Sequence, residues 1–244
     1  MAPSRTRGAT ARCSASRSAS SILKARWRAR SPRVAPEALA RAAPGARPHI
    51  LVTGFGRFPG MPSNPSAALA LALARSRRLG GARVEARILP TLWSEAASFP
   101  ALLDAAAPDI VLMLGVAGRR RHVCIERVAR NATGVFPDIA RQRPATRLLE
   151  PGAPAQRRFA AAPMPLLRAL REAGLPARLS REAGGYVCNA LAWRGYGWAA
   201  GTRRRAVFVH IPRPRPGALS RQRLQRGLEA LLMALAAQWR SAIP

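Results

Sequence analysis

Cys188 is the residue of this sequence best placed to act as a nucleophile. It follows the segment Gly-Gly-Tyr-Val at residues 184–187 and directly precedes a stretch with helical preference. A cysteine at a helix N-terminus lies near unpaired backbone N–H groups and the positive end of the helix dipole, which favour the thiolate and can bind an oxyanion. Cys124 has no comparable flank, and Cys13 falls in an arginine- and serine-rich segment. The alternative is that Cys188 is a small buried hydrophobic residue, the commoner role of a cysteine.

His210 and Glu126 have the side chains that would complete a catalytic arrangement around such a thiol. His210 ends the apolar run 207–209 just before Ile-Pro, and a histidine can accept and return a proton near neutral pH. A structural histidine at a strand end is equally compatible with this context. Glu126 lies in the mainly apolar run 123–128, where it either orients the histidine or pairs with Arg127 or another arginine. Local sequence leaves these alternatives open.

The loop at residues 54–60, Gly-Phe-Gly-Arg-Phe-Pro-Gly, carries apolar side chains where polar ones are expected. Phe55 and Phe58 either pack into the core or line a small pocket for a flat, weakly polar ligand. The glycine spacing is not the Gly-x-Gly-x-x-Gly of a dinucleotide site, and the acid that would bind the ribose is missing from the end of the second predicted strand. We therefore expect no cofactor at this loop.

Short apolar strands alternate with helix-favouring segments, a pattern typical of a layered α/β domain. Strands are predicted at residues 49–53, 84–89, 110–114, 124–128 (the weakest), 177–180 and 207–210, and helices at 67–75, 92–106, 165–173, from 189 onward and at 219–239. The wholly apolar strand 110–114 should lie centrally, covered on both faces. We expect a single α/β/α domain over residues 48–244, with a twisted, largely parallel central sheet and a site where loops leave the carboxyl ends of its strands.

Residues 1–47 are rich in Arg, Ser, Ala and Pro and lack sustained apolar periodicity, so they are predicted to be a disordered arm. Such a segment is typical of a transit peptide, or results from a start codon placed too far upstream. The formal net charge of +30 would suggest a nucleic-acid partner. However, only Lys24 among 41 basic residues is a lysine, and no basic stretch carries interleaved aromatic side chains. We therefore expect no specific nucleic-acid partner.

Three cysteines at long, irregular intervals fit neither a disulfide framework nor a zinc site. We therefore expect no metal, and a reducing, cytoplasmic location is favoured. No apolar run approaches the ~20 residues that cross a bilayer, because the best candidate, residues 101–117, contains Asp104 and Asp109. We expect no membrane partner.

Several short motifs, taken together and in order, resemble one enzyme family. They are Thr53-Gly54-Phe55-Gly56 with Phe58 and Gly60, Asn64-Pro65-Ser66, Gly118-Arg119, Glu126-Arg127-Val128-Ala129 with Asn131, Pro137-Asp138, Ala183-Gly184, Tyr186-Val187-Cys188-Asn189 and Val209-His210-Ile211-Pro212. From about residue 50 through the final helix, the chain resembles the pyroglutamyl peptidase I, or pyrrolidone-carboxylate peptidase, family of cysteine peptidases.

This resemblance implies a peptidase that hydrolyses the amide bond after an N-terminal pyroglutamyl residue through a cysteine thioester. It implies catalytic residues at Glu126, Cys188 and His210 and substrate-binding residues at Phe55, Phe58, Asn64, Tyr186 and Val187. The aromatic side chains among these would flank the pyrrolidone ring. The implied partners are peptides with N-terminal pyroglutamate, no metal or cofactor is needed, and homo-oligomers are compatible with the family.

The sequence departs from the family pattern beside the expected pocket. Residues 132–136 are one residue shorter than the usual acidic stretch and lack its arginine. Ile139 follows Asp138 where asparagine is usual, and Gly-Arg-Arg at residues 118–120 replaces the common Gly-Gly-Arg. These changes leave two alternatives open: a related cysteine amidohydrolase that acts on another small cyclic or N-acyl amide, or a noncatalytic basic binding protein with the same fold.

Overall fold

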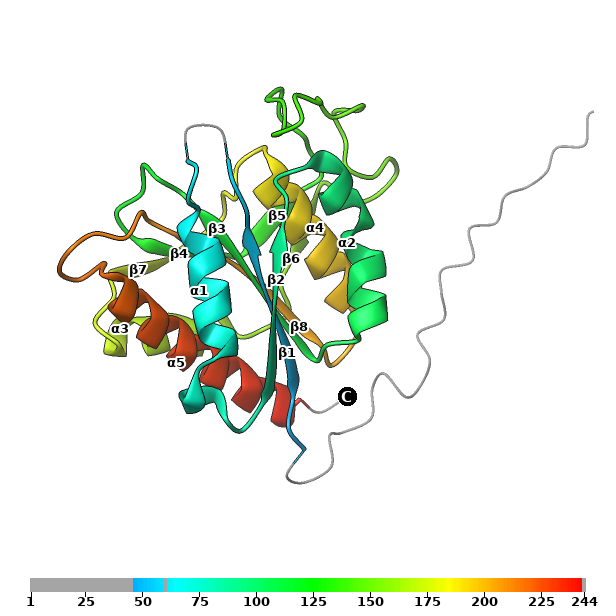
Figure 1. Cartoon of the computed structure of the whole chain (residues 1–244). Coiled ribbons are helices and arrows are strands. Elements are labelled where there is room, and N and C mark those ends of the chain that lie inside the picture. Colours follow the sequence, from blue (N-terminus) through cyan, green and yellow to red (C-terminus); the bar gives the residue numbers. More distant parts are fainter. Residues whose placement is uncertain (1–45, 59–60, 243–244) are drawn as a thin grey trace, which may run out of the picture. The chain divides into compact units, whose positions relative to one another are not determined.

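A six-stranded sheet with the strand order β2-β1-β3-β8-β4-β7 forms the centre of the protein (Figure 1). The computed structural model describes residues 46–58 and 61–242. The strands of the sheet are β1 His49–Phe55, β2 Arg83–Leu89, β3 Ile110–Val116, β4 Val123–Glu126, β7 Ala177–Ser180 and β8 Arg205–Ile211. All neighbouring strands are parallel except β4 and β8, which run antiparallel. The prediction of a largely parallel sheet is confirmed.

Helices cover both faces of this sheet, as predicted for an α/β/α domain. They are α1 Pro65–Ala74, the 3₁₀ helix η2 Arg77–Leu79, α2 Trp93–Ala106, α3 Pro163–Glu172, α4 Val187–Ala199 and α5 Arg221–Arg240. On one face α5 packs against both α1 and α3, and on the other face α2 packs against α4 (Figure 1). Within the described ranges, no helix is both long enough and apolar enough to cross a membrane.

The middle of the sheet is buried on both faces because its strands are apolar along almost their whole length. Residues 110–114 of β3 have no exposed surface, and β1 and β8 are buried from their second residue to their last. A strand covered on both faces is continuously apolar rather than alternating, so the central position predicted for residues 110–114 is confirmed. The loops that leave β1, β3 and β8 therefore start from fully packed strands.

The predicted strand at residues 124–128 is two strands in the structure, so that prediction was wrong. β4 ends at Glu126, and β5 Val128–Arg130 leaves the central sheet to pair antiparallel with β6 Gln156–Arg158. β6 has the sequence Gln-Arg-Arg and none of the apolar alternation that identifies a strand. Sequence patterning therefore missed β6 and the change of direction after β4.

Asn64 and Pro65 set the turn between β1 and α1. Asn64 Oδ1 accepts a hydrogen bond from the Ser66 N–H at 3.1 Å, and proline at the start of the helix has no N–H to leave unpaired. Asn64 Nδ2 also donates to the backbone oxygen of Gly56 at 3.0 Å. The Ser66 hydroxyl accepts from the Phe55 N–H at 3.0 Å. The helix cap therefore also orders the loop after β1.

Part of the predicted organisation lies outside the described residues. This applies to residues 1–45 of the predicted arm, to residues 59–60 of the glycine-rich loop and to the last two residues of the predicted domain. The predicted boundary at residue 48 lies one residue before β1 begins.

Candidate active site

A cavity of about 420 Å³ opens where the loops after β1, β3 and β8 meet the start of α4. Its lining residues are Phe55, Phe58, Met61, Asn64, Thr91, Val116, Gly118, Arg119, Tyr186, Cys188 and Arg213. Four of the five residues predicted to bind substrate therefore lie on the same cavity as the predicted nucleophile. The fifth, Val187, has a fully buried side chain that does not line the cavity.

Cys188 is the second residue of α4, and its sulfur lies over a glycine of the sheet. Tyr186 is the N-cap residue of α4, and no side chain caps this helix start. A Cβ atom built on Gly115 of β3 would lie only 3.1 Å from Cys188 Sγ. Gly115 is paired directly with His210 in the β3–β8 register. The missing side chain at Gly115 therefore leaves the space that the sulfur occupies, beside the strand that carries the histidine.

The surroundings of Cys188 favour the neutral thiol over the thiolate. Burial raises the pKa of Cys188 to about 12, and the negative charge of Glu126 adds to this effect. The backbone N–H of Cys188 and the charge of Arg120 oppose the shift without reversing it. Desolvation at this position acts against the thiolate that the helix N-terminus was expected to favour. The thiol therefore needs a base to accept its proton.

Glu126 and His210 form a buried hydrogen-bonded pair. His210 Nδ1 lies 2.8 Å from Glu126 Oε1, the carboxylate is fully buried, and the imidazole is 6% exposed. The antiparallel β4–β8 register pairs Glu126 with Phe208, which places His210 diagonally across from the carboxylate on the same face of the sheet. Because Nδ1 faces the carboxylate, Nε2 is the ring nitrogen that remains for proton transfer.

Arg120, rather than Arg127, is the arginine that pairs with Glu126. Its Nη1 donates to Oε1, the same carboxylate oxygen that faces His210. The pKa of Glu126 is lowered overall: desolvation, the largest single effect, acts to raise it, whereas the hydrogen bond and the charge of His210 act to lower it. Ser180 and Arg120 lower this pKa further. The carboxylate is therefore held in its ionised form beside the histidine.

Aromatic rings form one wall of the cavity. Tyr186 packs edge-on against Phe58 and Trp93, with ring centroids 5.7 and 5.5 Å apart. The Tyr186 hydroxyl donates to the backbone oxygen of Pro137 at 3.0 Å. Burial raises the pKa of Tyr186 to about 12, so this hydroxyl remains a donor at neutral pH. Trp93, which supports the wall from α2, was not identified from the sequence because it begins a helix without any recognisable motif.

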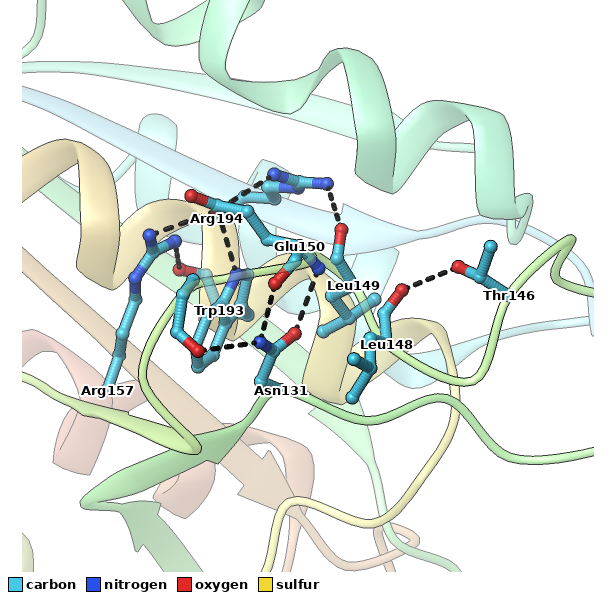
Figure 2. A network of polar contacts seen from close by, with 9 residues as sticks. Asn131, Thr146, Leu148, Leu149, Glu150, Arg157, Trp193 and Arg194 are labelled. Atoms are coloured by element: carbon cyan, nitrogen blue, oxygen red, sulfur yellow. Dashed lines mark hydrogen bonds and ion pairs between the residues drawn. The ribbon is translucent and has the colours of Figure 1, made fainter. Parts of the chain in front are cut away.

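The segment 131–150, which includes the departures from the family pattern at residues 132–139, is closed into a loop by a polar network (Figure 2). Asn131 Nδ2 donates to the backbone oxygen of Glu150 at 2.7 Å, and Asn131 Oδ1 accepts from the Glu150 N–H at 2.9 Å. Glu150 Oε2 lies 3.0 Å from Arg157 Nη2 and 3.3 Å from Arg194 Nη1. The two ends of the segment are therefore held together and fixed to α4 and β6.

Asn189 joins the start of this segment to the helix that carries the thiol. Its Oδ1 accepts from the Arg130 N–H at 2.8 Å, and its Nδ2 donates to the backbone oxygens of Arg130 and Ala132 at 2.8 and 3.0 Å. The side chain is almost fully buried, so these bonds replace the water that the amide would otherwise bind. Asn189 follows Cys188 directly, and no role for it was predicted from the sequence.

The chemistry available at this site is nucleophilic acyl transfer. A neutral thiol lies at a helix start beside the strand of a histidine whose other ring nitrogen is bound to a carboxylate, which is the nucleophile–base–orienter arrangement. Cys124 is also a free cysteine, but it is fully buried in β4 and does not line the cavity. Among the described residues, no group of three or more His, Cys, Asp or Glu side chains could hold a metal ion.

Comparison with known proteins gives consistent matches over most of the chain. Residues 48–231 match the family model described as pyroglutamyl peptidase. The pyrrolidone-carboxylate peptidase of Gloeobacter violaceus is 41% identical over 167 residues, which cover 67% of this chain and 80% of that protein. The pyrrolidone-carboxylate peptidase of Thermococcus kodakarensis is 35% identical over 191 residues, which cover 76% of this chain and 91% of that protein.

Solved structures show the same fold. Pyroglutamyl peptidase I from Bacillus amyloliquefaciens superposes with a TM-score of 0.71 at 26% identity, covering 78% of this chain and 96% of that structure. A mutant pyrrolidone carboxyl peptidase from Pyrococcus furiosus gives a TM-score of 0.70 at 26% identity, covering 78% of this chain and 98% of that structure. The sequence match extends from just before β1 into the middle of α5, so it includes the whole sheet and the cavity. The chain therefore belongs to the pyroglutamyl peptidase family and is a cysteine peptidase.

Proposed function

We propose that Cys188, His210 and Glu126 are the residues with which this peptidase removes an N-terminal pyroglutamyl residue from peptides. The observation that carries the proposal is the position of the three side chains. The Cys188 sulfur lies over Gly115, Gly115 pairs with His210, and His210 Nδ1 lies 2.8 Å from Glu126 Oε1. The family match supports the reaction type.

The proposed reaction begins with transfer of the Cys188 thiol proton to His210 Nε2, as Sγ attacks the carbonyl carbon of the pyroglutamyl residue. The ionised Glu126 stabilises the imidazolium that forms. Backbone N–H groups at the start of α4 bind the developing oxyanion, a contribution of ~3 to 4 kcal/mol per well-placed donor in comparable sites. His210 then returns the proton to the leaving amine, so the shortened peptide departs and a thioester remains.

Hydrolysis of the thioester completes the cycle. His210 takes a proton from a water molecule, whose oxygen attacks the thioester carbon. The sulfur leaves and regains its proton from His210, and free pyroglutamate is released. Each step uses one base that accepts and then returns a proton, which matches a thiol that is neutral at rest.

The cavity suits a flat, uncharged ring. Phe55, Phe58 and Tyr186 provide apolar contact area, and Asn64 holds the loop that carries the first two of these rings. A volume of about 420 Å³ is near the lower end of the usual range for small-molecule sites and is sufficient for the ring and the first atoms of a peptide. The pyrrolidone ring has no free amine, so it requires no carboxylate in the wall.

Hydrolysis of pyroglutamyl-aminomethylcoumarin tests the proposal. We expect turnover by the wild-type protein and a loss of roughly 10³-fold or more in Cys188→Ala. Cys124→Ala should retain most of the activity, because that side chain lies outside the cavity. An equal loss in the two variants would contradict the assignment of the nucleophile.

A panel of other acyl coumarins tests the substrate. The altered segment 132–139 supports the alternative of a related amidohydrolase, because Pro137 in that segment contacts Tyr186 of the cavity wall. Faster hydrolysis of an N-acetyl or another cyclic acyl group would reassign the substrate while keeping the catalytic residues.

We further propose a cytoplasmic location, since thiol chemistry requires a reduced cysteine. Assembly into homo-oligomers is tested by sedimentation velocity.

A further inference from the structure

Two arginines, Arg119 and Arg213, line the cavity that contains Cys188. Arg119 lies in the turn after β3 and Arg213 follows β8, and these strands are neighbours in the sheet. A Cβ atom built on Gly118 would lie 3.1 Å from Arg213 Nε, so the Arg213 side chain crosses over this glycine. The two guanidinium groups therefore bring positive charge to one edge of a largely apolar cavity.

Neither guanidinium has an acidic partner within the part of the chain that the structure describes. All ion pairs found there involve other residues. No Asp or Glu lines the cavity, and the buried Glu126 already pairs with Arg120 and His210. An anionic group that entered the cavity would therefore meet two unpaired positive charges and no free carboxylate.

The turn after β3 directs its two consecutive arginines to different sites. The Arg120 N–H bonds to the backbone oxygen of Ala117 at 2.9 Å, which closes the turn. Arg120 reaches the buried Glu126, whereas Arg119 is exposed and lines the cavity. The charge of Arg119 is therefore not consumed by the catalytic carboxylate.

The pyroglutamyl ring does not account for these charges. The ring and its acyl carbonyl are neutral, and the aromatic side chains of the cavity already provide apolar contact. The part of a peptide substrate that can carry a negative charge lies beyond the scissile bond, in the amine that leaves. Arginine binds carboxylates through two parallel N–H···O bonds, so a pair of arginines is suited to a side-chain carboxylate there.

We infer that Arg119 and Arg213 make this protein selective for pyroglutamyl peptides in which an acidic residue directly follows the pyroglutamate. The inference rests on the proposed function, because it assigns a substrate class to the same site. Each exposed arginine–carboxylate pair strengthens binding by up to about fivefold. Two such pairs predict a preference of roughly five- to tenfold for an acidic over an equally sized neutral residue.

The test compares pyroglutamyl-glutamate amide with pyroglutamyl-glutamine amide. These two dipeptide amides have nearly the same shape and differ in one negative charge, so the ratio of their kcat/KM values isolates the charge. We expect a ratio of roughly five to ten at low salt, falling towards one at about 0.5 M NaCl because exposed charges are screened. A wild-type ratio near one at low salt would overturn the inference.

The variant Arg119→Gln/Arg213→Gln should bring this ratio to about one. The matched control is Arg168→Gln/Arg226→Gln, which removes two exposed arginines of α3 and α5 that do not line the cavity. The control should keep the wild-type ratio. An unchanged ratio in the first variant, or an equal fall in both, would show that the selectivity does not depend on these two side chains.

Charge reversal and binding complete the experiment. In Arg119→Glu/Arg213→Glu, pyroglutamyl-lysine amide should become the best of the three substrates, and failure of this reversal would count against direct contact. Calorimetric binding of the Glu and Gln amides to Cys188→Ala measures the same preference without turnover. An absent binding preference overturns the inference, whereas an inactive wild-type enzyme that shows the binding preference overturns the proposed function alone.

Discussion

Replacing Gly115 by alanine should slow the enzyme, because the new methyl group would displace Cys188, the proposed nucleophile. The added Cβ would lie 2.8 Å from Phe208 Cζ and 3.1 Å from Cys188 Sγ, whereas ordinary contacts begin at 3.4 Å. Phe208 is fully buried in β8, and Cys188 borders the cavity, so the sulfur has more freedom to move. The sulfur must then shift by about 0.3 Å, the difference between its 3.1 Å distance from the added Cβ and the 3.4 Å at which ordinary contacts begin.

The size of the effect follows from this displacement. A misplacement of about 1 Å in a reacting group costs ~100-fold in rate, so a shift of a few tenths of an ångström predicts roughly a fourfold loss in kcat. The crowded Phe208 ring should also lower the free energy of unfolding by ~1 to 3 kcal/mol. We expect KM for pyroglutamyl-aminomethylcoumarin to change little, because the aromatic wall is not touched.

The matched control is Gly81→Ala. A Cβ on Gly81 would meet no atom within 4 Å, so both kcat and the free energy of unfolding should stay near the wild-type values. Both variants are assayed well below their melting temperatures, with unfolding followed by circular dichroism. A wild-type kcat in Gly115→Ala would refute the argument that the glycine provides the space for the sulfur.

Three further predictions concern the charge, the thiol and the loop. Glu126→Gln should reduce kcat by roughly 10³ to 10⁴-fold, since it removes the charge that stabilises the imidazolium; wild-type rates would demote Glu126 to a structural role. Because the pKa of Glu126 is lowered from 4.5, its ionised form stabilises the fold above that pH. The stability deficit of Glu126→Gln in urea titrations should therefore be present at neutral pH and disappear as the pH falls through the lowered pKa. Alkylation of Cys188 by iodoacetamide should keep accelerating above pH 9, because its pKa is raised to about 12, and a plateau near neutral pH would show a resting thiolate. Asn131→Ala should expose the segment 131–150 to trypsin by removing the bonds that close it, and an unchanged cleavage map would show that Glu150 and its arginines hold the loop alone.

The elements predicted correctly are those with strong local patterns. The run 110–114 is apolar without interruption, so its central position followed from composition alone. The helix predicted at residues 67–75 is present as α1, and Asn64 and the proline after it set its start through a local cap. Cys188 at a helix start and a histidine near a strand end are also local patterns. The structure places Cys188 on the cavity and His210 in β8, paired with the glycine over which the sulfur lies.

The features that were missed depend on contacts between distant residues. The reversed direction of β4 allows Glu126 to reach His210, and no local pattern encodes the direction of a short strand. The helix end that favours the Cys188 thiolate is visible in the sequence, whereas the burial that raises the pKa of this thiol is a property of the assembled fold.

The three bonds of the Asn189 side chain have a consequence for inhibition. Asn189 directly follows Cys188, and its side-chain amide forms hydrogen bonds with the backbone of Arg130 and Ala132. A compound that competed for those peptide groups would free the first turn of α4 and move the thiol relative to His210, its proposed base. Such a compound would inhibit the enzyme without occupying the substrate cavity.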